Sequence, residues 1–270
     1  MHKIVLYNKS FSRDVNRSKK MLNSMFTNNV DNIPIYISCP SVDLELFKNT
    51  LGTDGYTLVA DEEIYQLKSN LDGWRSQQIV KSNLHKLNIT ENYLCVDSDA
   101  FFINKFKVSD FMANDDTPYV VMNENKEVQQ YEKLFFGRNY KENGYTDAVK
   151  KYRKVFGTEY SHVWDYGPPP YLWSCKVWKD FEENYLNQNN IDFEQFQIHM
   201  QNNFNIFMRE AVTYGEYLLA TRVMDMIPIG PFFKFYHWKE MYEYESKTGM
   251  YDIEKLKENY LGIVMQSNWS

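Results

Sequence analysis

Two acidic residues that directly follow an apolar run have the types and spacing best suited to chemistry. The run Tyr93-Leu94-Cys95-Val96 predicts a buried β-strand, and it leads straight into Asp97-Ser98-Asp99. Ligands of open α/β sheets bind at the carboxyl ends of the strands, so we expect both acids at the functional edge. Two such carboxylates can share a divalent cation, and their oxygens suit Mg²⁺ or Mn²⁺, which would neutralise a nucleotide's diphosphate leaving group. The alternative is that the triplet only caps a helix or closes a turn.

Two further carboxylates are candidates for a base that deprotonates an acceptor hydroxyl. Glu216 follows Gly215 at the opening of an apolar helix, and Asp165 lies in the aromatic segment 162–167. An acid in the first turn of a helix also simply favours the helix dipole. The sequence does not choose between the two residues, nor between inversion and retention at the transferred sugar.

The first hundred residues contain the elements that must position these acids. Short apolar runs alternate there with helical patterns, which is typical of βαβ units in a mostly parallel sheet flanked by helices. No repeat or linker divides the chain, so we expect one domain. We expect strands at 4–7, 33–37, 56–59 and 93–96, a helix capped by Ser12 with Val15, Leu22, Met25 and Phe26 on its apolar face, and a helix at 74–87 opened by Asp72 and Gly73.

After Asn104 the pattern changes, and the added elements are expected to hold an acceptor. The segment 164–173 combines aromatic residues with three prolines, and it reads either as a semi-rigid substrate wall or as a loop that seals the core. We expect a helix within an insertion at 123–145, strands at 171–174 and 232–238, and helices at 176–186, 193–207, 211–223 and 253–260.

Composition excludes several classes of protein. With 30 Lys and Arg against 36 Asp and Glu, the net charge of −6 argues against a nucleic-acid partner. The three cysteines, Cys39, Cys95 and Cys175, are expected to be buried free thiols rather than zinc ligands or a disulfide framework. No apolar run is long enough for a signal peptide or a transmembrane segment. We therefore expect a cytoplasmic protein, whose contact with a membrane would be peripheral, at the inner face, through its acceptor.

Residues 73–81 and 93–103 together resemble the core of GT-A-fold glycosyltransferases. These segments read Gly73-Trp74-Arg75-Ser76-Gln77-Gln78-Ile79-Val80-Lys81 and Tyr93-Leu94-Cys95-Val96-Asp97-Ser98-Asp99-Ala100-Phe101-Phe102-Ile103. The resemblance is nearest to a little-characterised bacterial and viral group of the capsule or lipopolysaccharide type, and it is more distant to glycogenin-like transferases. It implies a Rossmann-like α/β fold with a nucleotide-sugar-binding half at 1–104 and an acceptor-binding half at 105–270.

The same resemblance implies roles for particular residues. Asp99 would coordinate the metal and Asp97 would touch the metal or the ribose. His237 would be a third metal ligand, although a histidine among aromatic residues is more often a packing residue. Lys81 would bind the donor, and it reads equally as a solvated helix lysine. Arg75 and Gln78 are weaker candidates for the same pocket, and the role of Lys239 at the phosphates depends on that of His237.

Our leading hypothesis is a metal-dependent glycosyltransferase that uses Mn²⁺ or Mg²⁺ and a nucleotide-diphosphate sugar. The acceptor would be a glycan or a lipid-linked saccharide. The expected pathway is surface polysaccharide synthesis. One alternative is a sugar-phosphate nucleotidyltransferase, although the first strand is not followed by the Gly-rich phosphate loop that such enzymes usually carry. The other alternative is a non-catalytic glycan- or nucleotide-binding protein on the same scaffold.

Overall fold

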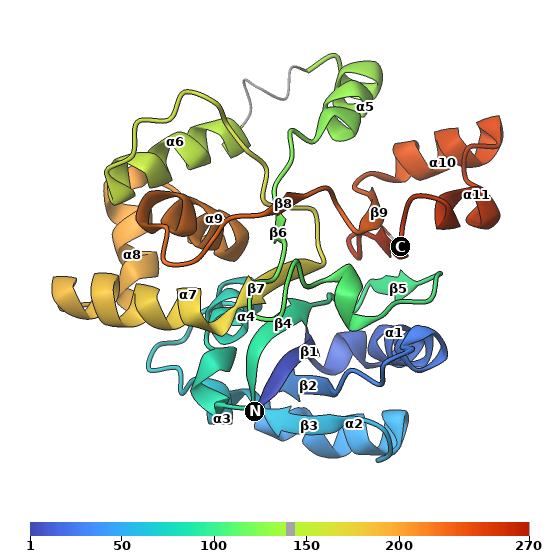
Figure 1. The fold of residues 1–270 in the computed structure, drawn as a ribbon, viewed down its shortest axis with the longest axis horizontal. Coiled ribbons are helices and arrows are strands. Elements are labelled where there is room, and N and C mark those ends of the chain that lie inside the picture. The colour runs from blue at the N-terminus through green and yellow to red at the C-terminus, as the bar shows by residue number, and fades with distance from the viewer. Residues whose placement is uncertain (139–143, 270) are drawn as a thin grey trace.

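The computed structural model of the chain has a five-stranded mixed sheet at its centre (Figure 1). The structure describes residues 1–138 and 144–269. The strand order is β3-β2-β1-β4-β7, in which β1, β2, β3 and β4 run parallel and β7 runs antiparallel to β4. The strands are β1 (His2–Lys9), β2 (Ile35–Cys39), β3 (Thr57–Ala60), β4 (Thr90–Cys95) and β7 (Tyr171–Ser174).

Helices cover both faces of this sheet, because successive side chains of a strand point to opposite faces. Tyr7 of β1 faces a core that contains Trp178, whereas the preceding Leu6 faces a second core that contains Phe47. The helices of the first half are α1 (Val15–Asn28), α2 (Leu44–Leu51), α3 (Asp61–Ile64) and α4 (Gly73–Ser82). Those of the second half are α5 (Lys126–Phe136), α6 (Gly144–Phe156), α7 (Cys175–Asp180), α8 (Phe193–Phe204), α9 (Glu210–Thr221), α10 (Lys239–Thr248) and α11 (Ile253–Lys257).

A smaller sheet lies beside the central one and carries the C-terminal part of the chain. Its order is β5-β10-β9, with β5 (Ala100–Phe102) antiparallel and β9 (Phe233–Tyr236) parallel to β10 (Gly262–Met265). A parallel pair is formed by β6 (Val120–Val121) and β8 (Pro228–Ile229). Because β5 follows Asp99 directly, the small sheet brings the end of the chain to the acidic triplet.

Most of the expected elements are present, but several boundaries differ. The four early strands form, and Asp72 caps α4 by accepting a hydrogen bond from the Arg75 N–H at 2.9 Å. Ser12 does not cap a helix: its N–H donates to Asp43 Oδ2 at 2.9 Å, and a 3₁₀ turn precedes α1. Phe26 is 45% exposed rather than part of the apolar face of α1.

The expected helix at 74–87 ends at Ser82, where a 3₁₀ turn over Leu84–Leu87 takes over. The helix expected at 176–186 starts as α7 and continues from Phe181 as a π-helical turn. Of the segment 123–145, residues 139–143 lie outside the described residues, and the rest contains α5 and the start of α6. The sequence interpretation missed α2, α10 and β10.

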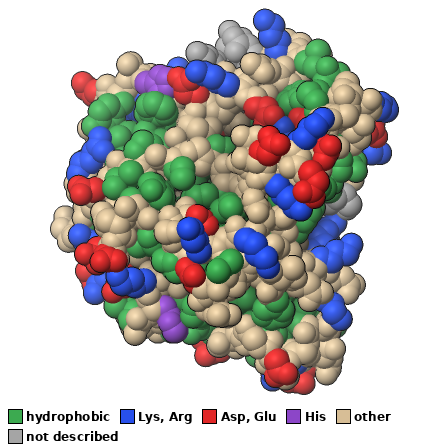
Figure 2. Space-filling model, turned by 45° about the vertical axis from the view of Figure 1, so that its right-hand side comes forward, with side chains coloured by type: hydrophobic (Ala, Val, Ile, Leu, Met, Phe, Trp, Pro, Cys, Tyr) green, Lys and Arg blue, Asp and Glu red, His purple; other side chains and the backbone are tan. Residues whose placement is uncertain are grey.

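Other expectations about the surface and the cysteines can be compared with the structure. All three cysteines are buried free thiols, as expected. On the face shown in Figure 2, acidic and basic side chains are interspersed rather than sorted by sign. No helix in the described part of the chain combines the length and the apolar character needed to cross a membrane.

Gly215 allows the loop before β7 to pack closely on α9. A Cβ atom at this position would lie 2.1 Å from the ring atom Cδ1 of Tyr166, which is far closer than van der Waals contact. We expect Gly215→Ala to lower the free energy of unfolding by about 1–3 kcal/mol through overpacking, although alanine is the better helix former. Urea denaturation measures the effect. Gly73→Ala is the matched control, because a Cβ there meets open space; equal unfolding midpoints for the two variants would contradict this packing argument.

Candidate active site

A large cleft lies at the carboxyl ends of the parallel strands, as the open α/β architecture predicts. Its volume is about 1510 Å³, above the roughly 300–1,000 Å³ of most small-ligand sites. Lys9, Asp61 and Asp97 line it from the ends of β1, β3 and β4. The opposite wall comes from the second half of the chain, including Asp165, Glu210, His237, Trp238 and Gln266.

Asp97 and Asp99 both line this cleft, directly after β4. The end of the chain holds Asp99: its Oδ2 accepts a hydrogen bond from the Ser267 N–H at 2.8 Å, and its carbonyl accepts one from the Met265 N–H at 3.0 Å. The other carboxylate oxygen, Oδ1, is buried without a hydrogen-bond partner. Burial, and next the negative charge of Asp97, raise the pKa of Asp99 to about 7. The site therefore concentrates negative charge that its own residues compensate incompletely.

The ammonium group of Lys81 offsets part of this negative charge. Its Nζ lies 2.6 Å from Asp97 Oδ1 and 3.7 Å from Glu210 Oε1, and the lysine side chain is buried. Burial by itself would lower the pKa of Lys81, but the charges around it, led by Asp97, hold that pKa well above its usual value. Lys81 is thus a permanent cation beside the acidic triplet. It comes from α4, where the sequence interpretation placed a donor-binding lysine.

Glu210 is a cleft residue that the sequence interpretation missed. It is the first residue of α9, it is buried, and burial raises its pKa although Lys81 lies nearby. The available signal was an acid at the start of an apolar helix, which had instead been assigned to Glu216.

Glu216 does not line the cleft, so its position does not support the expected role as a base. The side chain is fully buried, and Arg153 pairs with it through Nε at 3.0 Å. Tyr166 donates a hydrogen bond to Oε1 at 2.9 Å. Gly215 makes room for the Tyr166 ring. Glu216, Arg153 and Tyr166 therefore form a buried polar contact within the second half of the chain, away from the cleft lining.

Asp165, the other candidate base, does line the cleft. Its Oδ1 accepts a hydrogen bond from the Gly167 N–H at 2.9 Å, and its Oδ2 accepts one from Asn125 Nδ2 at 2.6 Å. Its backbone pairs with that of Asn123 in an isolated β-bridge. These contacts fix the carboxylate at the cleft wall.

Three expected donor-binding residues lie elsewhere. Arg75 pairs with Asp72 at 2.9 Å and lies over the Phe207 ring. Gln78 is buried, and its Oε1 accepts a hydrogen bond from the Glu210 N–H at 3.0 Å. Lys239 is a largely exposed residue whose partner is Glu243. None of the three is among the residues that line the cleft, because their positions on α4 and α10 point them to other surroundings.

His237 lines the cleft, and its Nδ1 is buried without a hydrogen-bond partner. Burial lowers the pKa of His237 against the opposing effects of Gln266, Glu132 and Asp165, which favours the neutral, metal-binding form of the ring. The donor set fits a hard divalent cation, since Asp99 Oδ1 also lacks a partner. Within the described residues, however, no three His, Cys, Asp or Glu side chains form a preassembled metal site. The third-ligand role of His237 therefore stays a prediction.

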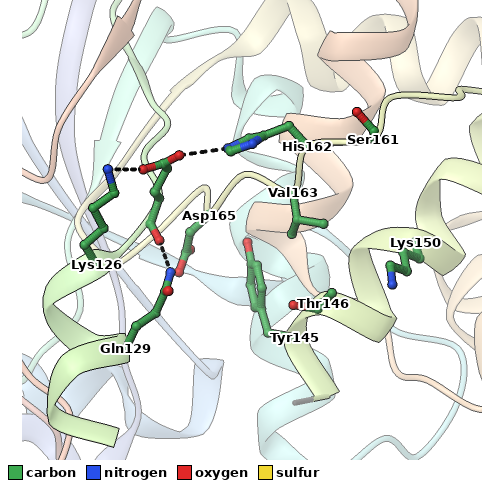
Figure 3. Close-up of a pocket in the computed structure, with 10 residues that line it drawn as sticks. Lys126, Gln129, Tyr145, Thr146, Lys150, Ser161, His162, Val163 and Asp165 are labelled. Atoms are coloured by element: carbon green, nitrogen blue, oxygen red, sulfur yellow. Dashed lines mark hydrogen bonds and ion pairs between the residues drawn. The ribbon is translucent and has the colours of Figure 1, made fainter. Parts of the chain in front are cut away.

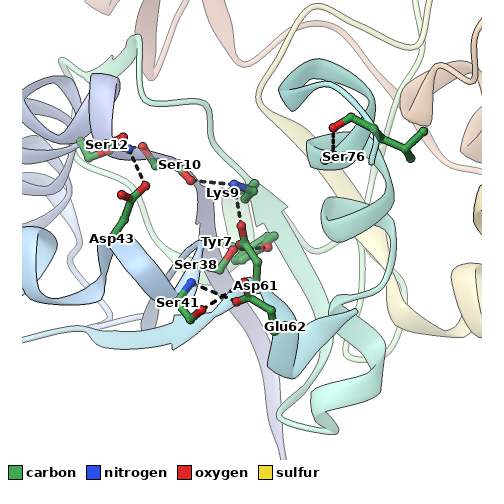
Figure 4. A network of polar contacts seen from close by, with 12 residues as sticks. Tyr7, Lys9, Ser10, Ser12, Ser38, Ser41, Asp43, Asp61, Glu62 and Ser76 are labelled. Atoms are coloured by element: carbon green, nitrogen blue, oxygen red, sulfur yellow. Dashed lines mark hydrogen bonds and ion pairs between the residues drawn. The ribbon is translucent and has the colours of Figure 1, made fainter. Parts of the chain in front are cut away.

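The ends of β1 and β3 form the other side of the cleft and are fixed by buried polar contacts (Figure 4). Lys9 Nζ lies 2.8 Å from Asp61 Oδ2, and Tyr7 and Ser38 share a hydrogen bond of 2.8 Å between their hydroxyls. Burial raises the pKa of Asp61 despite the adjacent Lys9. This part of the wall combines a cation with an acid that both face the cleft.

A side pocket of about 450 Å³ adjoins the cleft and shares Tyr145 and Asp165 with it (Figure 3). Glu124 lines this pocket and pairs with both Lys126 and His162. Because two residues line both spaces, the pocket adjoins the cleft beside Asp165.

Comparisons with known proteins agree with this architecture. Residues 4–240 match a family described as "Family of unknown function (DUF6492)". The chain belongs to this family. No curated protein sequence matches the chain.

Solved structures, in contrast, match nearly the whole length of the chain. Mouse xyloside xylosyltransferase 1 in its apo form has a TM-score of 0.51 at 9% identity, with 98% of each chain covered. The galactosyltransferase LgtC, solved with donor and acceptor sugar analogues, has a TM-score of 0.53 at 9% identity and covers 96% of this chain and 86% of its own. The expected fold is confirmed: the chain has the α/β fold of GT-A glycosyltransferases, with its parallel-rich sheet flanked by helices.

The raised pKa of Asp99 has a consequence for stability. Between its unfolded value near 3.8 and its folded value of about 7, the native state holds a proton that the unfolded chain has lost, so stability falls as pH rises through this window. We expect Asp99→Asn to remove this loss in metal-free protein. Its advantage over the wild type should grow by about 1.4 kcal/mol per pH unit at most between pH 4 and 7 and then level off.

Urea denaturation in the presence of a chelator, at a series of pH values, measures that difference. Asp115→Asn is the control, because the Asp115 side chain is 94% exposed and lies outside the cleft. A difference between Asp99→Asn and the wild type that does not change with pH would contradict the assigned pKa.

Proposed function

We propose that this protein is a glycosyltransferase that moves a sugar from a nucleotide-diphosphate sugar to a hydroxyl of a glycan or lipid-linked acceptor. The observation that carries the proposal is the pair Asp97 and Asp99, which lies in the large cleft at the carboxyl end of β4, with Asp99 Oδ1 unpartnered. A nucleotide-diphosphate ligand bridged by a cation is the chemistry that such a pair would bind. The pathway that we propose is surface polysaccharide synthesis, in keeping with the sequence resemblance.

Asp97 and Asp99 would hold Mn²⁺ or Mg²⁺, with His237 as the proposed third protein ligand. When bound, the cation would offset the charge that develops on the departing diphosphate. Lys81 contacts one oxygen of Asp97, which leaves the second oxygen of this partly exposed carboxylate for the ribose or the metal. Through this contact Lys81 would also hold Asp97 in place beside the donor.

The donor and the acceptor would enter from different sides of the cleft. The nucleoside would lie toward the ends of β1 and β3, where Lys9 and Asp61 face the cleft. The acceptor would lie toward Asp165 and the side pocket, and Asp165 is our candidate for the group that receives the hydroxyl proton. Placement of the two substrates in contact supplies much of the rate enhancement in such a reaction. The fold shared with a xylosyltransferase and a galactosyltransferase supports this class of activity.

Calorimetry with uridine and guanosine diphosphates, with and without Mn²⁺, tests the proposal. We expect the wild type to bind at least one of them in a metal-dependent manner. Asp99→Asn should weaken that binding by more than about tenfold, because even indirect partners of metal ligands contribute ten- to a hundredfold. The variant should remain folded, since asparagine keeps the shape and the acceptor for the Ser267 N–H.

Asp115→Asn again serves as the matched control and should bind as the wild type does, because its side chain is remote from the cleft. Metal-dependent binding of equal strength by Asp99→Asn would refute the proposed site. Absence of binding by the wild type to any nucleotide diphosphate would refute the proposed function.

A further inference from the structure

Helix α5 is fastened to the β9–α10 region by a buried polar cluster. Lys234 Nζ of β9 lies 2.7 Å from Glu245 Oε1 of α10, and it also pairs with Glu127 of α5. The hydroxyl of Tyr131 donates to Glu245 Oε1 at 2.6 Å, and that of Tyr236 donates to Oε2 at 2.7 Å. Each oxygen of the buried Glu245 carboxylate therefore receives a donor, and α5 is held in a fixed place at the cleft wall.

Glu132, the residue after Tyr131, receives no comparable support. It is only 5% exposed, and its Oε2 is buried without a hydrogen-bond partner. Among the described residues, Glu132 pairs with Arg138, whose Nε lies 3.7 Å from Oε1. The Arg138 side chain is 61% exposed, so that contact is weak. A buried carboxylate oxygen without a donor is costly, and in a protein such a group calls for a specific explanation.

Glu132 is also one of the residues that line the main cleft. Trp238 lines the same cleft and is half-buried. The ring of Phe136, from the last turn of α5, packs edge-on against Trp238 with 5.3 Å between ring centroids. The buried polar cluster thus fixes α5 at the cleft wall, and α5 carries both Glu132 and the Phe136 ring that contacts Trp238.

This combination defines the chemistry of a ligand. Glu132 requires a hydroxyl or N–H donor, and an indole surface favours the apolar face of a sugar ring. The Glu132 carboxylate itself disfavours an anionic group beside it. We propose that Glu132 and Trp238 form a subsite for a neutral saccharide, which binds through a hydroxyl donated to Glu132. This inference rests on the proposed function in that the saccharide would be the acceptor.

Saturation-transfer NMR without nucleotide or metal tests the subsite directly. The probes are the methyl glycosides of glucose, galactose and xylose, lactose, glucosamine and glucuronic acid at millimolar concentration. We expect at least one neutral saccharide to bind the wild type. Glu132→Gln should weaken that binding by roughly tenfold, because it replaces a charge-assisted hydrogen bond with a neutral one. Trp238→Leu should weaken it further by removing the stacking surface.

Thermal unfolding separates this role from a structural one. Glu132→Gln should raise the melting temperature, since it removes an uncompensated buried charge, whereas a structural carboxylate would lower it when replaced. The control is Glu159→Gln, at an exposed glutamate outside the cleft. It should change neither saccharide binding nor the melting temperature.

Four results would overturn the proposal: no neutral saccharide binds the wild type, only the ammonium-bearing or the acidic sugar binds, Glu132→Gln binds as the wild type does, or Glu132→Gln lowers the melting temperature. Metal-dependent nucleotide binding is measured separately, by calorimetry on the wild type. Absence of nucleotide binding by the wild type would count against the proposed function alone. Any of the four results above would count against this subsite alone.

Discussion

The cost of burying one acid beside another at the end of β4 is the constraint around which the cleft is arranged. Asp97 and Asp99 are separated by one residue. Burial makes ionisation of Asp99 costly, so the pKa of Asp99 rises to about 7. Lys81 offsets part of this charge, but its closest contacts are with Asp97 and Glu210 and not with Asp99. In our proposal, the remaining negative charge is the source of metal-dependent donor binding.

The second half of the chain completes a site that the first half begins. The main sheet delivers the acids, and the end of β10 then supplies the backbone donor that orients Asp99. The small sheet and α5 place His237, Trp238 and Glu132 on the opposite wall. The cleft is thus enclosed by elements far apart in the sequence, and in our proposal its two sides bind the two substrates.

Local patterns allowed the central part of this account to be predicted from the sequence. The apolar run before Asp97 and the cap at Asp72 depend on neighbouring residues, and both form as expected. Contacts between distant residues were not predictable in this way. Glu216 had the same local pattern as a cleft acid, but it is neutralised by Arg153, 63 residues away in the chain. The partner of Asp99 at Ser267 is separated from it by 168 residues.

Diffraction at the manganese absorption edge, from crystals grown with Mn²⁺ and the nucleoside diphosphate that calorimetry selects, tests the central claim most directly. The account predicts an anomalous peak within coordination distance of carboxylate oxygens of both Asp97 and Asp99, with the diphosphate on its other side. A bound nucleotide without that peak, or a peak coordinated by other residues, would contradict it.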